Sequence, residues 1–153
     1  MQRKCVLEAD GYQVVFYLSS LNYTQDNIGI IIMFVLNPLL GTVSLKTPAH
    51  SISIENLYRL IEYFEQHITN LKKNPEVDCY TFVTSELNFQ IQALSGIVLS
   101  DNQGSFSLQV LINVGQADEK ASRTYVGGES VVKFENVHKF TSCLQMALQE
   151  ATS

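Results

Sequence analysis

The sequence predicts an α+β fold made of two antiparallel, strand-rich halves, each closed by a helix. Apolar residues recur at helical spacing between Ser53 and Asn74 and again after Asn136, which indicates two amphipathic helices. Runs of alternating apolar and polar residues come before each helix and indicate half-buried antiparallel strands. Strand runs that are followed by helices favour the α+β class over alternating α/β units.

An internal repeat underlies this prediction. Residues 54–60 and 134–140 share one order of residue types: apolar, acidic, amide, apolar, aromatic, basic, apolar. The residues at 26–29 also resemble those at 101–104, and a longer loop near residues 116–121 accounts for the change in offset. We therefore expect a single domain, 1–153, with halves 1–74 and 75–153 related by a pseudo-two-fold axis. Chance alignment of two similar layouts is the alternative.

In the first half we expect strands at residues 4–8, 12–19, 28–36 and 41–46. Asp10 and Gly11 are typical of a two-residue hairpin turn. Residues 28–36 are almost wholly apolar, which predicts a central strand that is covered on both faces. Ser53 is the expected N-cap of the first helix, and Arg59 is placed to pair with Glu55 or Glu62.

In the second half we expect strands at residues 79–84, 87–93 and 106–112. Two further segments, 123–126 and 130–134, are expected to be separated by a bulge or tight turn at Gly127 and Gly128. Asn136 is the expected cap of the last helix.

Composition excludes several classes of protein. The chain has 153 residues, 46% of them hydrophobic, so it can bury a core and is not disordered. No apolar run is long enough to cross a bilayer, and no signal peptide is recognisable, which predicts a cytoplasmic protein that does not bind membranes. The three cysteines, Cys5, Cys79 and Cys143, are far apart; we expect small buried thiols and no disulfide framework.

The charge is acidic and unevenly distributed. The net charge is −5, and residues 75–153 hold the whole excess, with nine acidic and four basic side chains. Because the chain has no basic stripe, we do not expect it to bind nucleic acid.

No catalytic, metal or cofactor motif is present. His50, His67 and His138 lack HxH or HxxxH spacing, and we expect His67 to lie on the surface. The two glycines at 127 and 128 belong to no phosphate-binding motif. We therefore expect a protein without metal or cofactor that works by binding and not by catalysis.

The candidate binding residues are acidic side chains and two tyrosines. Tyr58 and Tyr63 border the apolar stripe of the first helix, where a ring can be half buried while its hydroxyl stays in water. The acidic residues could form a patch that attracts a basic partner protein, or only a solvated surface. They are Glu76, Asp78, Asp118, Glu119 and Glu129.

The order of elements resembles that of small bacterial immunity proteins, which neutralise polymorphic toxins. This resemblance covers most of the chain as a layout, without a shared signature motif. It implies inhibition by occlusion, in which a folded acidic protein covers the active face of a basic partner protein. Two alternatives remain open: a small-molecule-binding or enzymatic domain with a site between the halves, and an assembly subunit. The latter would form a homo-oligomer through an exposed strand edge or helix face.

Overall fold

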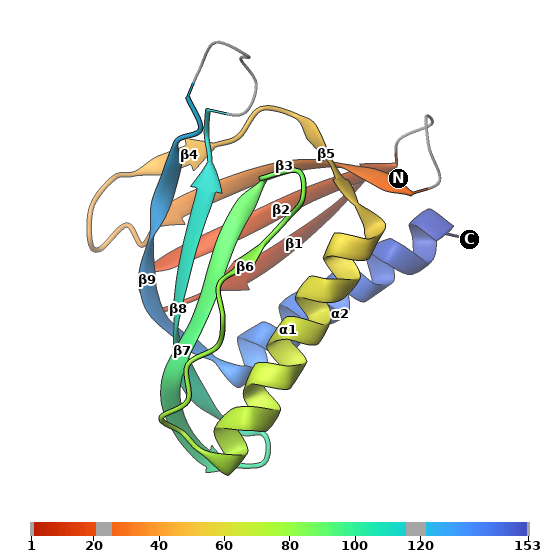
Figure 1. Ribbon diagram of the computed structural model, residues 1–153. Coiled ribbons are helices and arrows are strands. Elements are labelled where there is room, and N and C mark those ends of the chain that lie inside the picture. The colour runs from red at the N-terminus through yellow and green to blue at the C-terminus, as the bar shows by residue number, and fades with distance from the viewer. Residues whose placement is uncertain (1, 21–25, 116–121, 153) are drawn as a thin grey trace.

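Two antiparallel sheets and two helices make up the molecule (Figure 1). The computed structural model describes residues 2–20, 26–115 and 122–152. The strands are β1 (Gln2–Glu8), β2 (Tyr12–Ser20), β3 (Asn27–Leu36), β4 (Ser44–Lys46), β5 (His50–Ser53), β6 (Phe82–Val83), β7 (Phe89–Ser100), β8 (Gln103–Asn113) and β9 (Tyr125–Lys133). The helices are α1 (Ile54–Lys73) and α2 (Phe134–Thr152). The predicted α+β class, with one helix after each strand-rich half, is confirmed.

The first sheet has the order β1-β2-β3-β4, and β5 also pairs with β3. The second sheet is the meander β6-β7-β8-β9. Each half thus passes through an antiparallel sheet and enters its helix directly from a strand, β5 or β9. The strand β4 has no counterpart among the described residues of the second half. An origin of the two halves by duplication stays a prediction.

The β1–β2 hairpin and the central position of β3 follow the sequence prediction. Glu8 pairs with Gln13, and Ala9 donates to the Tyr12 carbonyl, which leaves Asp10 and Gly11 as a two-residue turn. β3 lies between β2 on one side and β4 and β5 on the other. Its second face is only partly covered, because Ile31, Met33 and Val35 are half-buried.

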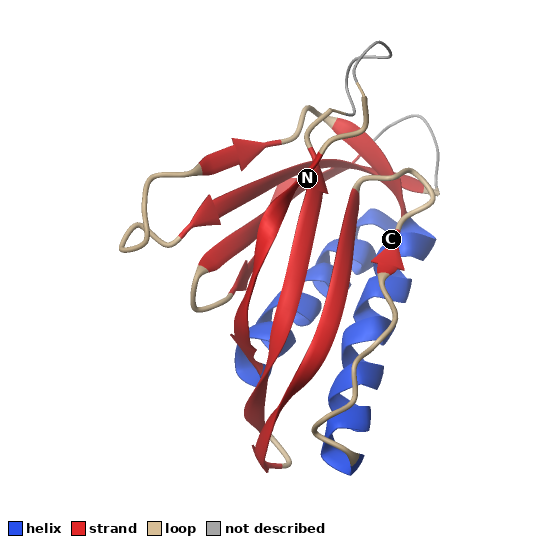
Figure 2. Ribbon diagram, turned by 60° about the vertical axis from the view of Figure 1, so that its left-hand side comes forward, coloured by secondary structure: helices blue, strands red, loops and turns tan. Residues whose placement is uncertain are grey.

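Each helix packs on the sheet of the other half as well as on its own. α1 lies along β7 and β5, whereas α2 lies along β1, β8 and β9. Both helices cover the same side of the paired sheets (Figure 2). The aromatic ring of Phe16 joins the layers, because its centroid lies 5.3 Å from that of Phe89 and 5.2 Å from that of Phe140. The core is therefore shared between the halves.

The helix α1 begins and ends as the sequence predicts. The Ser53 hydroxyl accepts a hydrogen bond from the Asn56 backbone N–H, and Asn74 is the C-cap. Glu55 in the first turn and Lys72 and Lys73 in the last turn complement the helix dipole. The predicted cap of α2 is wrong. That helix begins at Phe134, so Asn136 lies inside its first turn.

The prediction of a break at Gly127 and Gly128 is also wrong. β9 runs without interruption, with Gly127 opposite Leu111 and Gly128 opposite Val110. A Cβ atom on Gly127 would lie 1.8 Å from the Val110 carbonyl oxygen, so glycine here permits a close approach of two strands. Sequence reasoning also missed β5 and made β6 too long, because only Phe82 and Val83 pair with β7.

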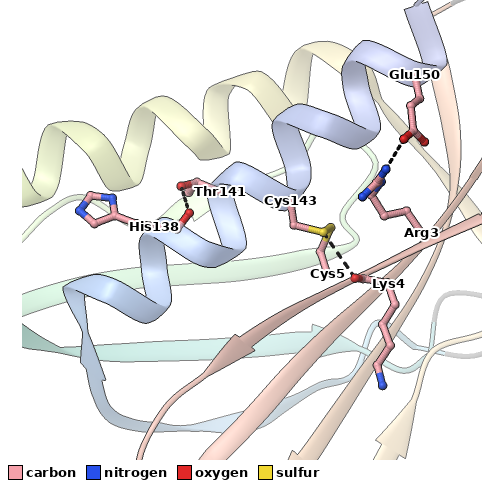
Figure 3. Close-up of a disulfide and its surroundings, with 7 residues drawn as sticks. All are labelled: Arg3, Lys4, Cys5, His138, Thr141, Cys143 and Glu150. Atoms are coloured by element: carbon pink, nitrogen blue, oxygen red, sulfur yellow. Dashed lines mark hydrogen bonds and ion pairs between the residues drawn. A yellow bond between two sulfur atoms is a disulfide. The ribbon is translucent and has the colours of Figure 1, made fainter.

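The chain contains a disulfide that the sequence did not predict. Cys5 in β1 and Cys143 in α2 are joined, with a Cα–Cα distance of 5.6 Å and a sequence separation of 138 (Figure 3). Cys79 is the one free cysteine. An ion pair between Arg3 and Glu150 lies on the same β1–α2 contact. The expectation of three unpaired thiols is therefore wrong.

Candidate functional site

The exposed side of α1 forms a shallow groove. It consists of two adjoining depressions, of about 490 Å³ and about 690 Å³, which share Arg59 and Glu62. The segment that follows α1 supplies Cys79 and Tyr80 as one wall of the smaller depression. Figure 2 shows this segment running beside the helix up to β6. We call this surface the acidic groove; its carboxylates are Asp26, Glu55, Glu62 and Glu65.

Among the described residues, no cationic side chain forms a salt bridge with a carboxylate of the acidic groove. The salt bridge between Arg3 and Glu150 is the only one found among the described residues, and it lies elsewhere. The predicted pairing of Arg59 with Glu55 or Glu62 is not formed. Arg59 donates instead to the side-chain oxygen of Asn56 at 2.7 Å, and its guanidinium carbon lies 5.0 Å from the centroid of the Phe82 ring. The groove therefore has a surplus of negative charge.

A hydrogen-bond network holds the N-terminal end of α1 against the turn between β6 and β7. The side-chain amide of Asn56 donates to the Ser85 hydroxyl at 2.9 Å and to the Glu86 carboxylate at 2.6 Å. The other Glu86 oxygen accepts from the Ser53 backbone N–H at 3.1 Å. Asn56 is buried, so these bonds fix the helix and Arg59 together. The groove is thus built on a rigid frame.

Tyr63 lies beneath the groove and is not a surface residue. Only 2% of its surface is exposed, and its hydroxyl donates to the Tyr80 carbonyl at 2.6 Å and accepts from the Ala93 backbone N–H at 2.9 Å. Burial raises the pKa of this phenol above its usual value, although the Ala93 hydrogen bond acts in the opposite direction. The prediction that its hydroxyl stays in water is wrong. Tyr63 supports the wall that carries Tyr80.

The tyrosines that remain accessible are Tyr58 and Tyr80. Tyr58 is 43% exposed, as the sequence predicts, and Tyr80 is 65% exposed. Each borders one depression, Tyr58 the larger and Tyr80 the smaller. Large amphipathic rings beside a charged surface are typical of protein interfaces.

The predicted acidic residues do not form one patch. Glu76 and Asp78 lie on the segment that carries Tyr80, and Asp78 accepts a hydrogen bond from the Ser95 backbone N–H at 2.9 Å. Glu129 lies on β9, beside a different depression between the two sheets. Asp118 and Glu119 lie outside the described residues. The structure therefore places Tyr58 on α1, at the acidic groove, and Glu76 and Asp78 on the segment that follows α1, where neither lines the groove; Glu129 lies apart.

The acidic residues of the first half were not predicted as binding residues, because the net charge of residues 1–74 is zero. The six basic side chains of residues 1–74 cancel six acidic ones in a sum. Of the basic ones, only Arg59 lines the groove, while the carboxylates at 55, 62 and 65 share the exposed side of one helix. Their helical spacing is the signal that could have revealed them.

His67 is buried and not on the surface, so that prediction is wrong. Its side chain is 0% exposed, its ring centroid lies 4.8 Å from that of Phe106, and its Nε2–H donates to the Leu94 carbonyl at 2.8 Å. Its Nδ1 atom has no hydrogen-bond partner in the part of the chain that the structure describes. Burial lowers the pKa of His67, while the Leu94 carbonyl and Asp78 act in the opposite direction. The imidazole is therefore a neutral part of the core.

The groups with shifted pKa values do not converge on one site. Burial raises the pKa of Tyr12 and lowers that of His50, but Tyr12 lies at the junction of the sheets and His50 in β5. No cluster of three or more metal-ligating side chains occurs in residues 2–20, 26–115 and 122–152. In those same ranges, no helix combines the length and apolar character needed to cross a bilayer.

Comparison of the sequence with protein-family models and with curated proteins gave no match.

Proposed function

We propose that the protein is a binding protein without catalytic activity, and that its acidic groove covers a basic face of a partner protein. The uncompensated carboxylates of the acidic groove are the observation that carries this proposal. Four of them lie around a single cation, Arg59, which is itself engaged by Asn56 and Phe82. A cationic partner would relieve the repulsion between them and would be attracted from a distance.

The frame of the groove supports the same function. Little conformational entropy is lost when a partner docks on a surface that is already fixed. α1 is capped at both ends, buries nine residues and is bonded to the β6–β7 turn through Asn56. Tyr58 and Tyr80 add aromatic area that can become buried on binding.

Inhibition by occlusion, as in an immunity protein, is the specific form of this proposal. The lining residues Glu55, Glu62, Glu65 and Gln66 are all exposed, so the groove is shallow and suits a protein surface better than a small molecule. A cytoplasmic location is also part of the proposal. The disulfide between Cys5 and Cys143 would be reduced in the cytoplasm. Alkylation of the protein in its native cells therefore tests the location, because an intact disulfide there would contradict it.

Affinity capture with matched charge reversals tests the binding function. Wild-type protein, Glu62→Lys and Glu8→Lys would be used to capture partners from the native cells at low and moderate salt. Glu8 is an exposed residue of β1 and receives the same change of charge. We expect one basic partner, captured more weakly at moderate salt and at least about tenfold more weakly by Glu62→Lys.

The Glu8→Lys control separates an effect of the acidic groove from a general effect of charge. Glu8→Lys should retain the partner, and Tyr58→Ala and Tyr80→Ala should weaken it in a purified binding assay. Equal binding by Glu62→Lys and wild type, or a partner without basic character, would show that the acidic groove is not the binding site.

A further inference from the structure

β9 is an edge strand whose outer main-chain groups are open over part of its length. It pairs with β8 on one side, and no other strand among the described residues pairs with it. In an antiparallel ladder, alternate residues direct both N–H and C=O to the same side. The Val131 carbonyl points away from β8, because it accepts from the Asp10 backbone N–H at 2.9 Å. By the same alternation, Gly127 and Glu129 also direct their N–H and C=O groups to the open edge.

An apolar depression of about 310 Å³ lies along this edge. We call it the seam groove, because it lies where the two sheets meet. One wall is β9 from Val126 to Ser130. The other comes from the first sheet and from the β3–β4 connection: Tyr12, Phe34, Leu36, Leu40, Val43 and Leu45. Leu40 is 66% exposed and Val43 is 44% exposed, so apolar surface remains open to solvent beside free backbone groups.

Gly127 and Gly128 leave room for an added strand in the seam groove. Neither Gly127 nor Gly128 has a side chain that could block a neighbouring strand. A Cβ atom at position 128 would lie 3.6 Å from the nearest ring atom of Phe34, so side chains of an added strand could reach this apolar wall. Glu129 is exposed, and its position in the ladder places its side chain on the opposite face of the sheet from Gly128.

The β1–β2 turn already forms hydrogen bonds with one end of this edge. Asp10 donates to the Val131 carbonyl, and Gly11 donates to the Ser130 hydroxyl at 2.8 Å. These hydrogen bonds show that the edge accepts main-chain donors. Because the Val131 carbonyl is already occupied, the open part of the edge ends at residue 131. Pairing of β9 with β9 of a second copy, with Gly127 opposite Glu129, would place Tyr125 against Val131 of that copy, where Asp10 lies. A separate extended segment avoids this conflict.

We propose that the edge of β9 binds an extended segment of a partner protein by strand addition. The main chain of the segment pairs with Gly127 and Glu129, apolar side chains enter the seam groove, and a basic side chain lies opposite Glu129. Strand addition of this kind takes affinity from main-chain hydrogen bonds and specificity from alternate side chains. This surface is distinct from the acidic groove and does not depend on the function proposed for it.

The test uses the blocked peptide Val-Lys-Val-Lys-Val and the full-length, isotopically labelled protein. In antiparallel pairing, the two lysines lie opposite Gly127 and Glu129 and direct their own N–H groups to β9, whereas the valines direct theirs away. N-methylation of the lysines should therefore abolish binding, and N-methylation of the valines should preserve it. Nuclear magnetic resonance should show shifts and slowed exchange of the Gly127 and Glu129 amides when the peptide is added.

Two variants of one residue separate the main chain from the charge. Glu129→Pro removes an N–H that points away from β8, a position where an edge strand tolerates proline, and should weaken binding by at least about tenfold. Glu129→Gln keeps the N–H and should only reduce the preference for lysine over glutamine in the peptide. Glu62→Lys in the acidic groove should bind the peptide as wild type does.

Three results of the peptide experiments overturn the proposal. These are the absence of shifts at Gly127 and Glu129 at millimolar peptide, equal binding of the two N-methylated peptides, and peptide-induced shifts that lie along α1. A dimer in sedimentation, with both amides protected before peptide is added, would instead identify a second copy as the occupant and would also overturn it. The N-methylated peptides keep the test decisive even if Glu129→Pro fails to fold.

Discussion

The hydroxyl of Tyr63 lies 2.9 Å from the backbone nitrogen of Ala93 and accepts its hydrogen bond. This contact joins α1 of the first half to β7 of the second. The same hydroxyl donates to the Tyr80 carbonyl at 2.6 Å, so a single oxygen atom holds the helix, the strand and one wall of the acidic groove together.

Removing that oxygen should destabilise the fold. In Tyr63→Phe, the buried Ala93 N–H and the part-buried Tyr80 carbonyl both lose a partner, which should lower the free energy of unfolding by about 1–3 kcal/mol. Urea denaturation measures this change. Tyr58→Phe is the control: its ring is 43% exposed, and we expect a change within about 0.5 kcal/mol. Equal effects in the two variants would contradict the bridging role.

The disulfide should contribute strongly to stability, because it closes a long loop. Its sequence separation of 138 is large. Cross-linking so long a loop restricts the unfolded chain and so raises the free energy of unfolding by about 3–5 kcal/mol. We expect the double variant Cys5→Ser, Cys143→Ser to unfold at lower urea concentration by a corresponding amount. Thiol titration of the native oxidised protein should detect one cysteine, Cys79. Detection of three thiols in oxidised protein would be incompatible with the bond.

Gly127 and Gly128 should differ sharply in their tolerance of alanine. A Cβ atom at position 127 would lie 1.8 Å from the Val110 oxygen, whereas at position 128 its nearest neighbour would be Phe34 at 3.6 Å. Gly127→Ala should therefore cost more than about 2 kcal/mol, because the backbone of β8 must move. Gly128→Ala should be nearly neutral. Thermal denaturation of both variants measures the contrast, and similar melting temperatures would argue against the close approach of the strands.

Stability should depend on pH through His67. Its pKa is lowered in the folded protein from the usual 6.5, so the unfolded chain binds a proton more readily. The contribution of neutral His67 is complete above pH 6.5 and is lost as the pH falls from there through the lowered pKa. Protonation would also place an N–H on Nδ1, for which the described residues offer no acceptor. Melting temperatures of wild type and His67→Gln across this range should differ in slope, and parallel profiles would contradict the prediction.

The elements with a regular pattern could be predicted from the sequence. The alternation of Phe106, Leu108, Val110 and Ile112 gave the buried face of β8, and Ser53 and Asn74 gave both ends of α1. Such patterns depend on one element and its own contact with the core. Where a pattern is local, the sequence is enough.

Features that depend on contacts between distant elements could not be predicted. Tyr63 borders the apolar stripe of α1, and it is buried only because the segment with Tyr80 returns over it. His67 is buried for a similar reason, next to Leu94 and Phe106 of the second sheet. The pairing of Cys5 with Cys143 requires knowing that β1 lies under α2. One carboxylate of the acidic groove was hidden for the same reason, because Asp26 lies far from α1 in the sequence and directly precedes β3.

The contact of β1 with α2 has a consequence for how the chain matures during synthesis. Among the described elements, β1 is synthesised first, and α2, the helix that covers it, is synthesised last, some 130 residues later. The side of β1 that α2 covers in the folded protein therefore stays exposed while the second sheet is translated. We expect the nascent chain to resist proteolysis only after α2 has emerged, and a chaperone that shields apolar strands would be most useful in that interval.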